Sequence, residues 1–228
     1  MLPLFITEFN NYYFIPEYYY MSQKMFIVCL DLEGVLIPEI WHEVAKQTNN
    51  DELLVTTREI PDLKELFAFR LNLLKKEQIR LLDLQNIIAK MKPLPGAADF
   101  LNNLREVSQV IILSDIFQQF YDPFASKLGY PTIMCHSLSV DSDGLINRFD
   151  LRLDNQKQKS VEAFKELKYK VIAAGDSFND LSMILNADLG ILYNPPQVIT
   201  SQYPNIPVAE NHDQLLLKIS QFIQSEGN

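Results

Sequence analysis

Acidic side chains follow two apolar segments that each have the pattern of a buried strand. Asp31 and Glu33 come after residues 26–30, and Asp176 comes after residues 169–174. Short continuous apolar runs are typical of parallel strands covered on both faces. Ligands of open α/β sheets bind outside the carboxyl ends of such strands. We therefore expect these carboxylates to meet at one site.

Two further groups of this sequence could hold a phosphate beside the acids. Ser114 and Asp115 follow a third apolar run, residues 110–113, where hydroxyl and backbone N–H groups can bind phosphate oxygens. Lys157 precedes a helical pattern over residues 158–167. Its ammonium could offset negative charge, although an isolated lysine is more often solvated. The serine could equally be a routine helix N-cap.

The charges of these residues suit covalent phosphoryl transfer. Two unit charges about 4 Å apart interact by about 4 kcal/mol at an effective dielectric of 20, so Asp31 repels a phosphate ester. Mg²⁺ between Asp31, Asp176 and a phosphate oxygen would neutralise both partners, with Lys157 assisting. Asp176 and Asp180, four residues apart, suit such a hard cation. A phosphoaspartate on Asp31 would then be discharged by water or another hydroxyl.

A doubly wound parallel α/β sheet would bring these residues together, because apolar runs alternate with helical patterns. Residues 38–92 are longer than one crossover requires, and we expect them to form a small helical cap inserted after the first strand. The core would then comprise residues 25–37 and 93–228. The three helical patterns of the cap span residues 40–47, 62–76 and 83–89.

The composition describes an acidic chain of ordinary hydrophobicity. It has 228 residues with 20 basic and 29 acidic side chains, a formal charge of −9, which disfavours nucleic acid and membrane surfaces as partners. No apolar run reaches the roughly 18 residues of a membrane span. Cys29 and Cys135 form no CxxC pattern and suit the reducing cytoplasm. The sequence is compatible with a homo-oligomer.

Residues 1–24 differ from the rest of the chain. They are rich in tyrosine and phenylalanine, and they lack the positive start of a signal peptide. We expect a poorly ordered extension, or an upstream start codon with Met21 or Met25 as the true start. The alternative is a partner-binding segment, because exposed aromatic side chains often mark interfaces.

In this order, the motifs around Asp31, Ser114, Lys157 and Asp176 resemble those of the haloacid dehalogenase superfamily of phosphatases. The resemblance covers residues 26 to about 212 and implies a doubly wound core, a cap and Mg²⁺. Within the superfamily, the chain is most similar to bifunctional enzymes that hydrolyse phosphoserine and transfer its phosphoryl group to homoserine. The segments that carry this similarity are 31–41, 57–62, 70–71, 113–115 and 173–177.

Two differences from ordinary phosphoserine phosphatases favour the bifunctional subfamily. Those enzymes carry a second Asp where this chain has Glu33, and Ser-Gly-Gly where it has Ser114, Asp115 and Ile116. Ile116 itself stands where the subfamily would place Thr. The resemblance implies that Asp31 is the nucleophile and a metal ligand, and that Glu33 is the general acid/base with its backbone carbonyl on the metal. Asp176 would be the other protein ligand.

The resemblance also implies which residues bind the substrate. The phosphate would be held by Ser114, the Asp115 backbone, Lys157 and Asn179. Glu39 and Arg70 would bind the amino and carboxylate groups of the amino acid, and a guanidinium suits a carboxylate. Without the resemblance, a solvated helix position would be the better interpretation of Arg70. Arg58 is a weaker candidate for the carboxylate.

Two other functions compete with a phosphoserine phosphatase. One is a phosphatase of another small phosphate ester, in which the cap reads a different leaving group. The other is a non-catalytic phosphate-binding or receiver-type module, because receivers also phosphorylate an aspartate beside Mg²⁺. Receivers are shorter, however, and lack a cap insertion and a paired acid such as Glu33.

Overall fold

One seven-stranded sheet organises residues 25–227, the part of the chain that the computed structural model describes. Its order is β4-β3-β2-β1-β5-β6-β7. All neighbouring strands are parallel except β3 and β4. The predicted α/β class with a mostly parallel sheet is confirmed. The strands are β1 (Phe26–Leu30), β2 (Gln109–Phe117), β3 (Ile133–Val140), β4 (Ile146–Asp150), β5 (Lys170–Gly175), β6 (Leu189–Tyr193) and β7 (Val208–Ala209).

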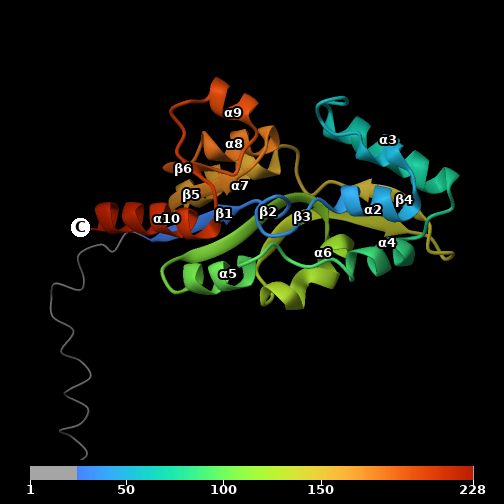
Figure 1. The fold of residues 1–228 in the computed structure, drawn as a ribbon, viewed down its shortest axis with the longest axis horizontal. Helices are drawn as coiled ribbons and strands as arrows, with labels where there is room; N and C mark the ends of the chain where they lie inside the picture. Colours follow the sequence, from blue (N-terminus) through green and yellow to red (C-terminus); the bar gives the residue numbers. More distant parts are fainter. Residues whose placement is uncertain (1–24, 228) are drawn as a thin grey trace, which may run out of the picture.

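Helices cover both faces of this sheet (Figure 1). One face carries α5, α6 and α10, and the other carries α7, α8 and α9. The helices are α2 (Ile40–Thr48), α3 (Leu63–Lys76), α4 (Leu81–Ile88), α5 (Ala97–Arg105), α6 (Gln118–Ala125), α7 (Gln156–Glu166), α8 (Leu181–Ile184), α9 (Gln197–Gln202) and α10 (His212–Gly227).

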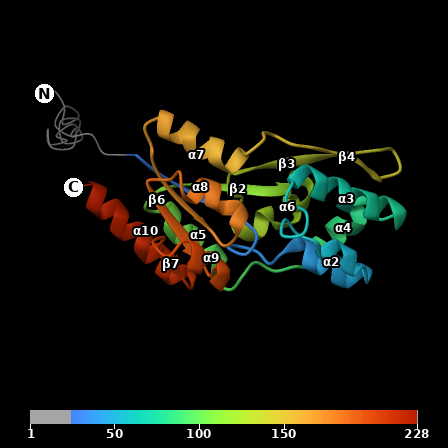
Figure 2. The same cartoon turned by 90° about the horizontal axis from the view of Figure 1, so that it is seen from above.

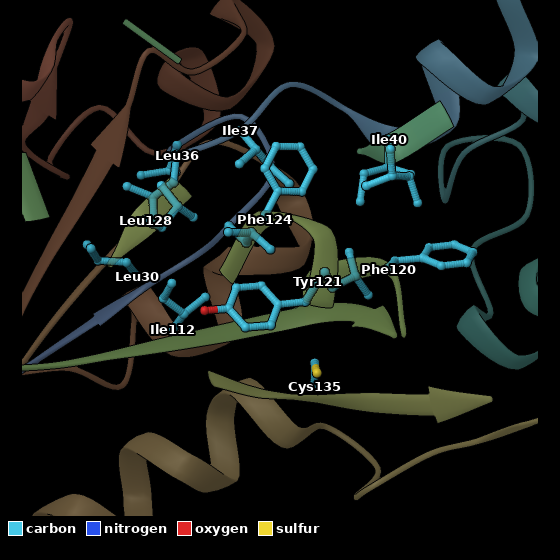
Figure 3. Close-up of a cluster of buried hydrophobic side chains, with 14 of the residues drawn as sticks. Leu30, Leu36, Ile37, Ile40, Ile112, Phe120, Tyr121, Phe124, Leu128 and Cys135 are labelled. Atoms are coloured by element: carbon cyan, nitrogen blue, oxygen red, sulfur yellow. The ribbon is translucent and has the colours of Figure 1, made fainter. Parts of the chain in front are cut away.

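Strand β1 is buried on both sides because its side chains alternate between two hydrophobic cores. Val28 and Leu30 belong to one core, and Ile27 and Cys29 to the other. Figure 3 shows the first core, where Leu30 and Ile112 of the sheet lie beside the aromatic side chains of α6. This packing fixes the end of β1, and therefore the position of Asp31, which follows it directly.

Residues 38–92 contain α2, α3 and α4, together with a short 3₁₀ helix at Asp51–Leu54. These helices gather at one end of the sheet, beside β3 and β4 (Figure 2). Helix α4 contacts α6, and α3 contacts β4. The three helical patterns predicted for this segment are confirmed, and the last one begins at Leu81 rather than at residue 83.

Two predicted boundaries, of a strand and of a helix beside the residues expected to bind phosphate, are wrong. Strand β2 continues through Ser114 and Asp115 to Phe117, and α7 begins at Gln156, so Lys157 lies inside its first turn. Cys29 and Cys135 are free and buried. The expectation for residues 1–24 lies outside the described residues. Within 25–227, no helix has the length and apolar character needed to cross a membrane.

Candidate active site

Asp31 and Asp176 emerge side by side because their strands are neighbours in the sheet. Strands β1 and β5 pair with Leu30 opposite Ala174, and the Asp31 N–H donates to the Ala174 carbonyl at 2.9 Å. Carboxylate oxygens of Asp31, Asp176 and Asp180 all lie within 4.8 Å of one another. The structure therefore brings together the acids that follow these two strands.

Lys157 lies in this acidic cluster and is only 4% exposed. Its Nζ donates to Asp31 Oδ1 at 2.9 Å and to Asp180 Oδ1 at 2.7 Å. Burial alone would lower the pKa of Lys157, but the charges of Asp180, Asp31 and Asp115 hold it well above its ordinary value. The lysine is thus a fixed cation beside Asp31, and the interpretation as a solvated surface residue is wrong.

Asp180 supports the loop that carries Asp176. Its Oδ2 accepts hydrogen bonds from the backbone N–H groups of Asp176 and Ser177, both at 3.0 Å, and from the Ser177 hydroxyl at 2.9 Å. A Cβ at Gly175 would collide with Cγ of Asp180, so only glycine fits there. Both oxygens of this fully buried carboxylate have protein partners, which makes Asp180 a supporting residue.

The acidic cluster fits a divalent cation. Burial and the charge of Asp180 raise the pKa of Asp31 well above its usual range and that of Asp176 to about 7. Negative charge therefore exceeds what Lys157 neutralises, and hard oxygen donors of this kind suit Mg²⁺. Gly34, at φ 74°, has no Cβ that would collide with Asp176, so the backbone can approach that carboxylate closely.

Glu33 lies beside this cluster and caps helix α2. Its Oε1 accepts the backbone N–H of Ile40 at 2.7 Å. Burial, followed by the charge of Glu39, raises the pKa of Glu33 to about 8. At neutral pH this carboxyl group therefore carries a proton that it can donate, which is what a general acid requires.

Arg70 is buried within α3 and does not lie on a solvated helix face. Its Nη2 donates to the Val55 carbonyl at 2.8 Å, and its guanidinium lies 4.4 Å from the ring centroid of Trp41. Its Nε is buried and has no partner among the described residues. Glu39 is exposed at the start of α2. Glu33, Glu39 and Arg70 line one cavity of about 290 Å³, together with Asp176.

The predicted phosphate residues lie around the same place. Ser114 is buried, and its carbonyl accepts a hydrogen bond from Gln156 Nε2 at 2.6 Å. Burial alone would raise the pKa of Asp115, but Lys157 and His136 hold it below its usual value. Asn179 lies exposed in the 3₁₀ turn Phe178–Asp180. Asp115 and Asn179 both line the cavity that contains Arg70.

Three residues at the site were not among the functional residues predicted from the sequence. Gln156 and His136 lie against Asp115, with Gln156 Nε2 at 3.4 Å and His136 Nε2 at 3.6 Å from its Oδ1. Thr57 donates from Oγ1 to Asn179 Oδ1 at 3.1 Å. Thr57 belongs to a segment that carries the family resemblance, which was a usable signal. No motif pointed to Gln156 or His136.

Comparison with known proteins identifies the family of the chain. A family model for haloacid dehalogenase-like hydrolases matches residues 27–188. The phosphoserine phosphatase ThrH of Pseudomonas aeruginosa is 46% identical over 191 residues, which are 84% of this chain and 93% of that protein. A phosphoserine phosphatase of Pseudomonas syringae pv. tomato is 45% identical over 189 residues, or 83% of this chain and 80% of that protein.

Solved structures share the fold. One, described as a phospho-aspartyl intermediate analogue of phosphoserine phosphatase, superposes with a TM-score of 0.71 at 20% identity. The match covers 86% of this chain and 99% of that chain. At this level of identity the likeness concerns the fold alone.

Proposed function

The chain belongs to the haloacid dehalogenase-like hydrolase family, and on that premise we propose that it hydrolyses O-phospho-L-serine through a phosphoaspartate on Asp31. One observation carries the proposal. The cavity lined by Glu33 and by the buried guanidinium of Arg70 is also lined by Asp176, beside Asp31. An acid, a carboxylate receptor and a nucleophile are thus arranged around one small space. The names of the two Pseudomonas relatives support the same substrate.

The proposed reaction has two steps. An oxygen of Asp31 attacks phosphorus, the bond to the serine oxygen breaks, and that oxygen takes the proton of Glu33. Glu33, now a carboxylate, removes a proton from a water molecule whose oxygen attacks the phosphorus of the phosphoaspartate. The bond between phosphorus and the Asp31 oxygen breaks, phosphate leaves, and Asp31 returns to a carboxylate. Lys157 holds Asp31 in place and balances its charge throughout. Mg²⁺, held by Asp31, Asp176 and the Glu33 carbonyl, would supply positive charge against the phosphoryl oxygens.

Binding of the substrate is divided between two parts of the chain. We assign the phosphate to Ser114, the Asp115 backbone, Lys157 and Asn179. The carboxylate of serine would bind Arg70, and its ammonium would bind Glu39. In this assignment residues 38–92 act as the cap, and residues 25–37 with 93–228 act as the core.

Transfer to L-homoserine is the second proposed activity. Homoserine carries the same ammonium and carboxylate as serine, so Glu39 and Arg70 would hold it in the same cavity. Its hydroxyl could then replace water as the group that discharges Asp31. The support for this step is the resemblance of the segments around Glu33 and Asp115 to the bifunctional subfamily.

Phosphorus NMR of one sample tests both activities. The sample contains the protein, phospho-L-serine, Mg²⁺ and excess L-homoserine, and Asp31→Asn serves as the control. Phosphohomoserine alongside phosphate would support both activities, and phosphate alone would leave a phosphoserine phosphatase. Unconsumed phosphoserine would overturn the substrate assignment, and other phosphate esters would then be screened.

A further inference from the structure

One hydrogen bond joins the cap segment to the predicted phosphate site. Thr57 Oγ1 donates to Asn179 Oδ1 at 3.1 Å, across 122 residues of sequence. Thr57 lies in the loop between the 3₁₀ helix Asp51–Leu54 and α3, and Asn179 lies in the turn before α8. This loop and this turn face each other in both views of the fold (Figures 1 and 2).

The loop that presents Thr57 is held in place by its own hydrogen bonds. The backbone N–H and the hydroxyl of Thr56 both donate to Glu59 Oε2 at 2.9 Å. Arg70 holds the start of the loop through the Val55 carbonyl at 2.8 Å. Hydrogen bonds of the two preceding residues, Val55 and Thr56, therefore hold the backbone that presents Thr57, and one of them comes from the residue assigned to the substrate carboxylate.

Asn179 gains a defined orientation from this bond. Its side chain is exposed, and an exposed amide can turn about its last torsion at little cost. With Oδ1 accepting from Thr57, the Nδ2 group is the end left for another partner, and among the described residues it has no hydrogen bond. An NH₂ group suits phosphate oxygens, whereas Oδ1 would repel them.

The two bonded residues also stand where two cavities meet. Thr57 and Asn179 line the cavity of about 290 Å³ that contains Arg70. They also line a second cavity of about 570 Å³ that contains Lys157 and His136. Asn179 therefore lies between the cavity that contains Arg70 and the cavity that contains Lys157, where the phosphoryl group is expected.

We infer that Thr57 is a positioning residue, whose hydroxyl turns the amide of Asn179 so that its NH₂ group faces the phosphoryl group. The inference rests on the proposed phosphatase reaction and adds a residue to it. Thr57 acts only through Asn179, so its contribution should vanish when Asn179 is absent. A threonine that merely stabilises its loop would lack this dependence.

A double-mutant cycle tests the inference. Thr57→Val keeps the shape and removes the donor, and we expect kcat/KM for phosphoserine to fall by roughly 3- to 10-fold, the worth of one ordinary hydrogen bond. Thr57→Ser keeps the donor and should recover most of that loss. In an Asn179→Ala background, Thr57→Val should cause no further loss. Thr200→Val is the matched control, because the Thr200 hydroxyl donates to the Gln197 carbonyl within α9, its one hydrogen bond among residues 25–227.

The affinity for inorganic phosphate, measured by calorimetry with Mg²⁺, tests the role of Thr57 independently of the proposed substrate. Thr57→Val should weaken phosphate binding by a similar factor, again only when Asn179 is present. If this holds while phosphoserine is not consumed, the substrate assignment fails and the positioning role stands. Three results would overturn the positioning role. They are full activity of Thr57→Val, an equal loss of kcat/KM in Thr57→Ser and Thr57→Val, and an undiminished effect of Thr57→Val in the Asn179→Ala background. Failure of the wild-type protein to bind phosphate would overturn it as well.

Discussion

The proposed phosphoryl end of the site and its proposed amino-acid end are built differently. Asp31 directly follows β1, Lys157 lies in the first turn of α7, and Asp180 lies in the 3₁₀ turn after β5. All three are buried and form hydrogen bonds of 2.7 to 3.0 Å. At the other end, Glu39 is exposed and Arg70 Nε has no partner among the described residues. The phosphoryl end is thus preorganised by the protein, whereas the amino-acid end keeps unused hydrogen-bonding capacity for a ligand.

Replacing Asp31, the proposed nucleophile at the preorganised end, should have the largest effect. Asp31→Asn keeps the size of the side chain and removes the attacking charge, so we expect turnover of phosphoserine to fall on the order of 10⁵-fold or more. Turnover and acid-stable phosphate on the protein are the measurements. The melting temperature should stay close to that of the wild type, because Lys157 retains Asp180. Substantial turnover by this variant would contradict the proposed chemistry.

Glu33 lies where the two ends meet, and its replacement should have the next largest effect. Glu33→Gln should slow turnover by roughly 10²- to 10⁴-fold, because the general acid is lost. Its pKa of about 8 means that wild-type Glu33 is protonated below pH 8 and loses its proton above it. When the first step limits the rate, wild-type activity should therefore fall as the pH rises through about 8. A pH profile of Glu33→Gln with that same fall would assign the proton to another group.

The amino-acid end should distinguish substrates rather than carry the chemistry. Arg70→Lys keeps the charge but loses the planar pair of donors, and we expect kcat/KM for phosphoserine to fall roughly 10- to 100-fold, the worth of one hydrogen bond to a charge. Turnover of an aryl phosphate, which has no carboxylate, should change little. Arg148→Lys is the control, since Arg148 is exposed and pairs with Asp150. Equal losses on phosphoserine and on the aryl phosphate would show that Arg70 does not determine substrate specificity.

The last prediction concerns the competition between protons and metal at Asp176, which changes the requirement for Mg²⁺ rather than the turnover at saturating metal. Its pKa of about 7 means that below pH 7 a proton must leave before the carboxylate can bind a cation. The Mg²⁺ concentration for half activity should therefore rise as the pH falls below 7, by up to about tenfold per pH unit. Chelation of the metal should remove activity reversibly. A half-saturating concentration that is constant from pH 7 to pH 5 would exclude Asp176 as a ligand.

The sequence predicted the phosphoryl end better than the amino-acid end because strand ends leave a local signal. Runs of apolar residues located β1 and β5, and the pairing of parallel strands then placed Asp31 beside Asp176. Arg70 carries no such signal, since a helical arginine is usually solvated, and the family resemblance was needed to select it.

Contacts between distant segments could not be predicted from the sequence. Gln156 donates to the Ser114 carbonyl, 42 residues away in the sequence, and no local sequence pattern predicts that contact. The start of α7 was misplaced for a related reason. Asn155 precedes it at φ 53° without a side-chain capping bond, so the usual sequence mark of a helix start is absent.

The position of β1 in the middle of the sheet has a consequence for how the protein folds. Residues 27–30 pair with residues 109–112 on one side, and residues 26–30 pair with residues 170–174 on the other. Both pairings close long loops, which makes them slow steps in folding. Asp31 is held in place only after both have formed, so the catalytic centre is completed late. A chain in which either pairing is missing would therefore not hold Asp31 in place and would have no phosphatase activity.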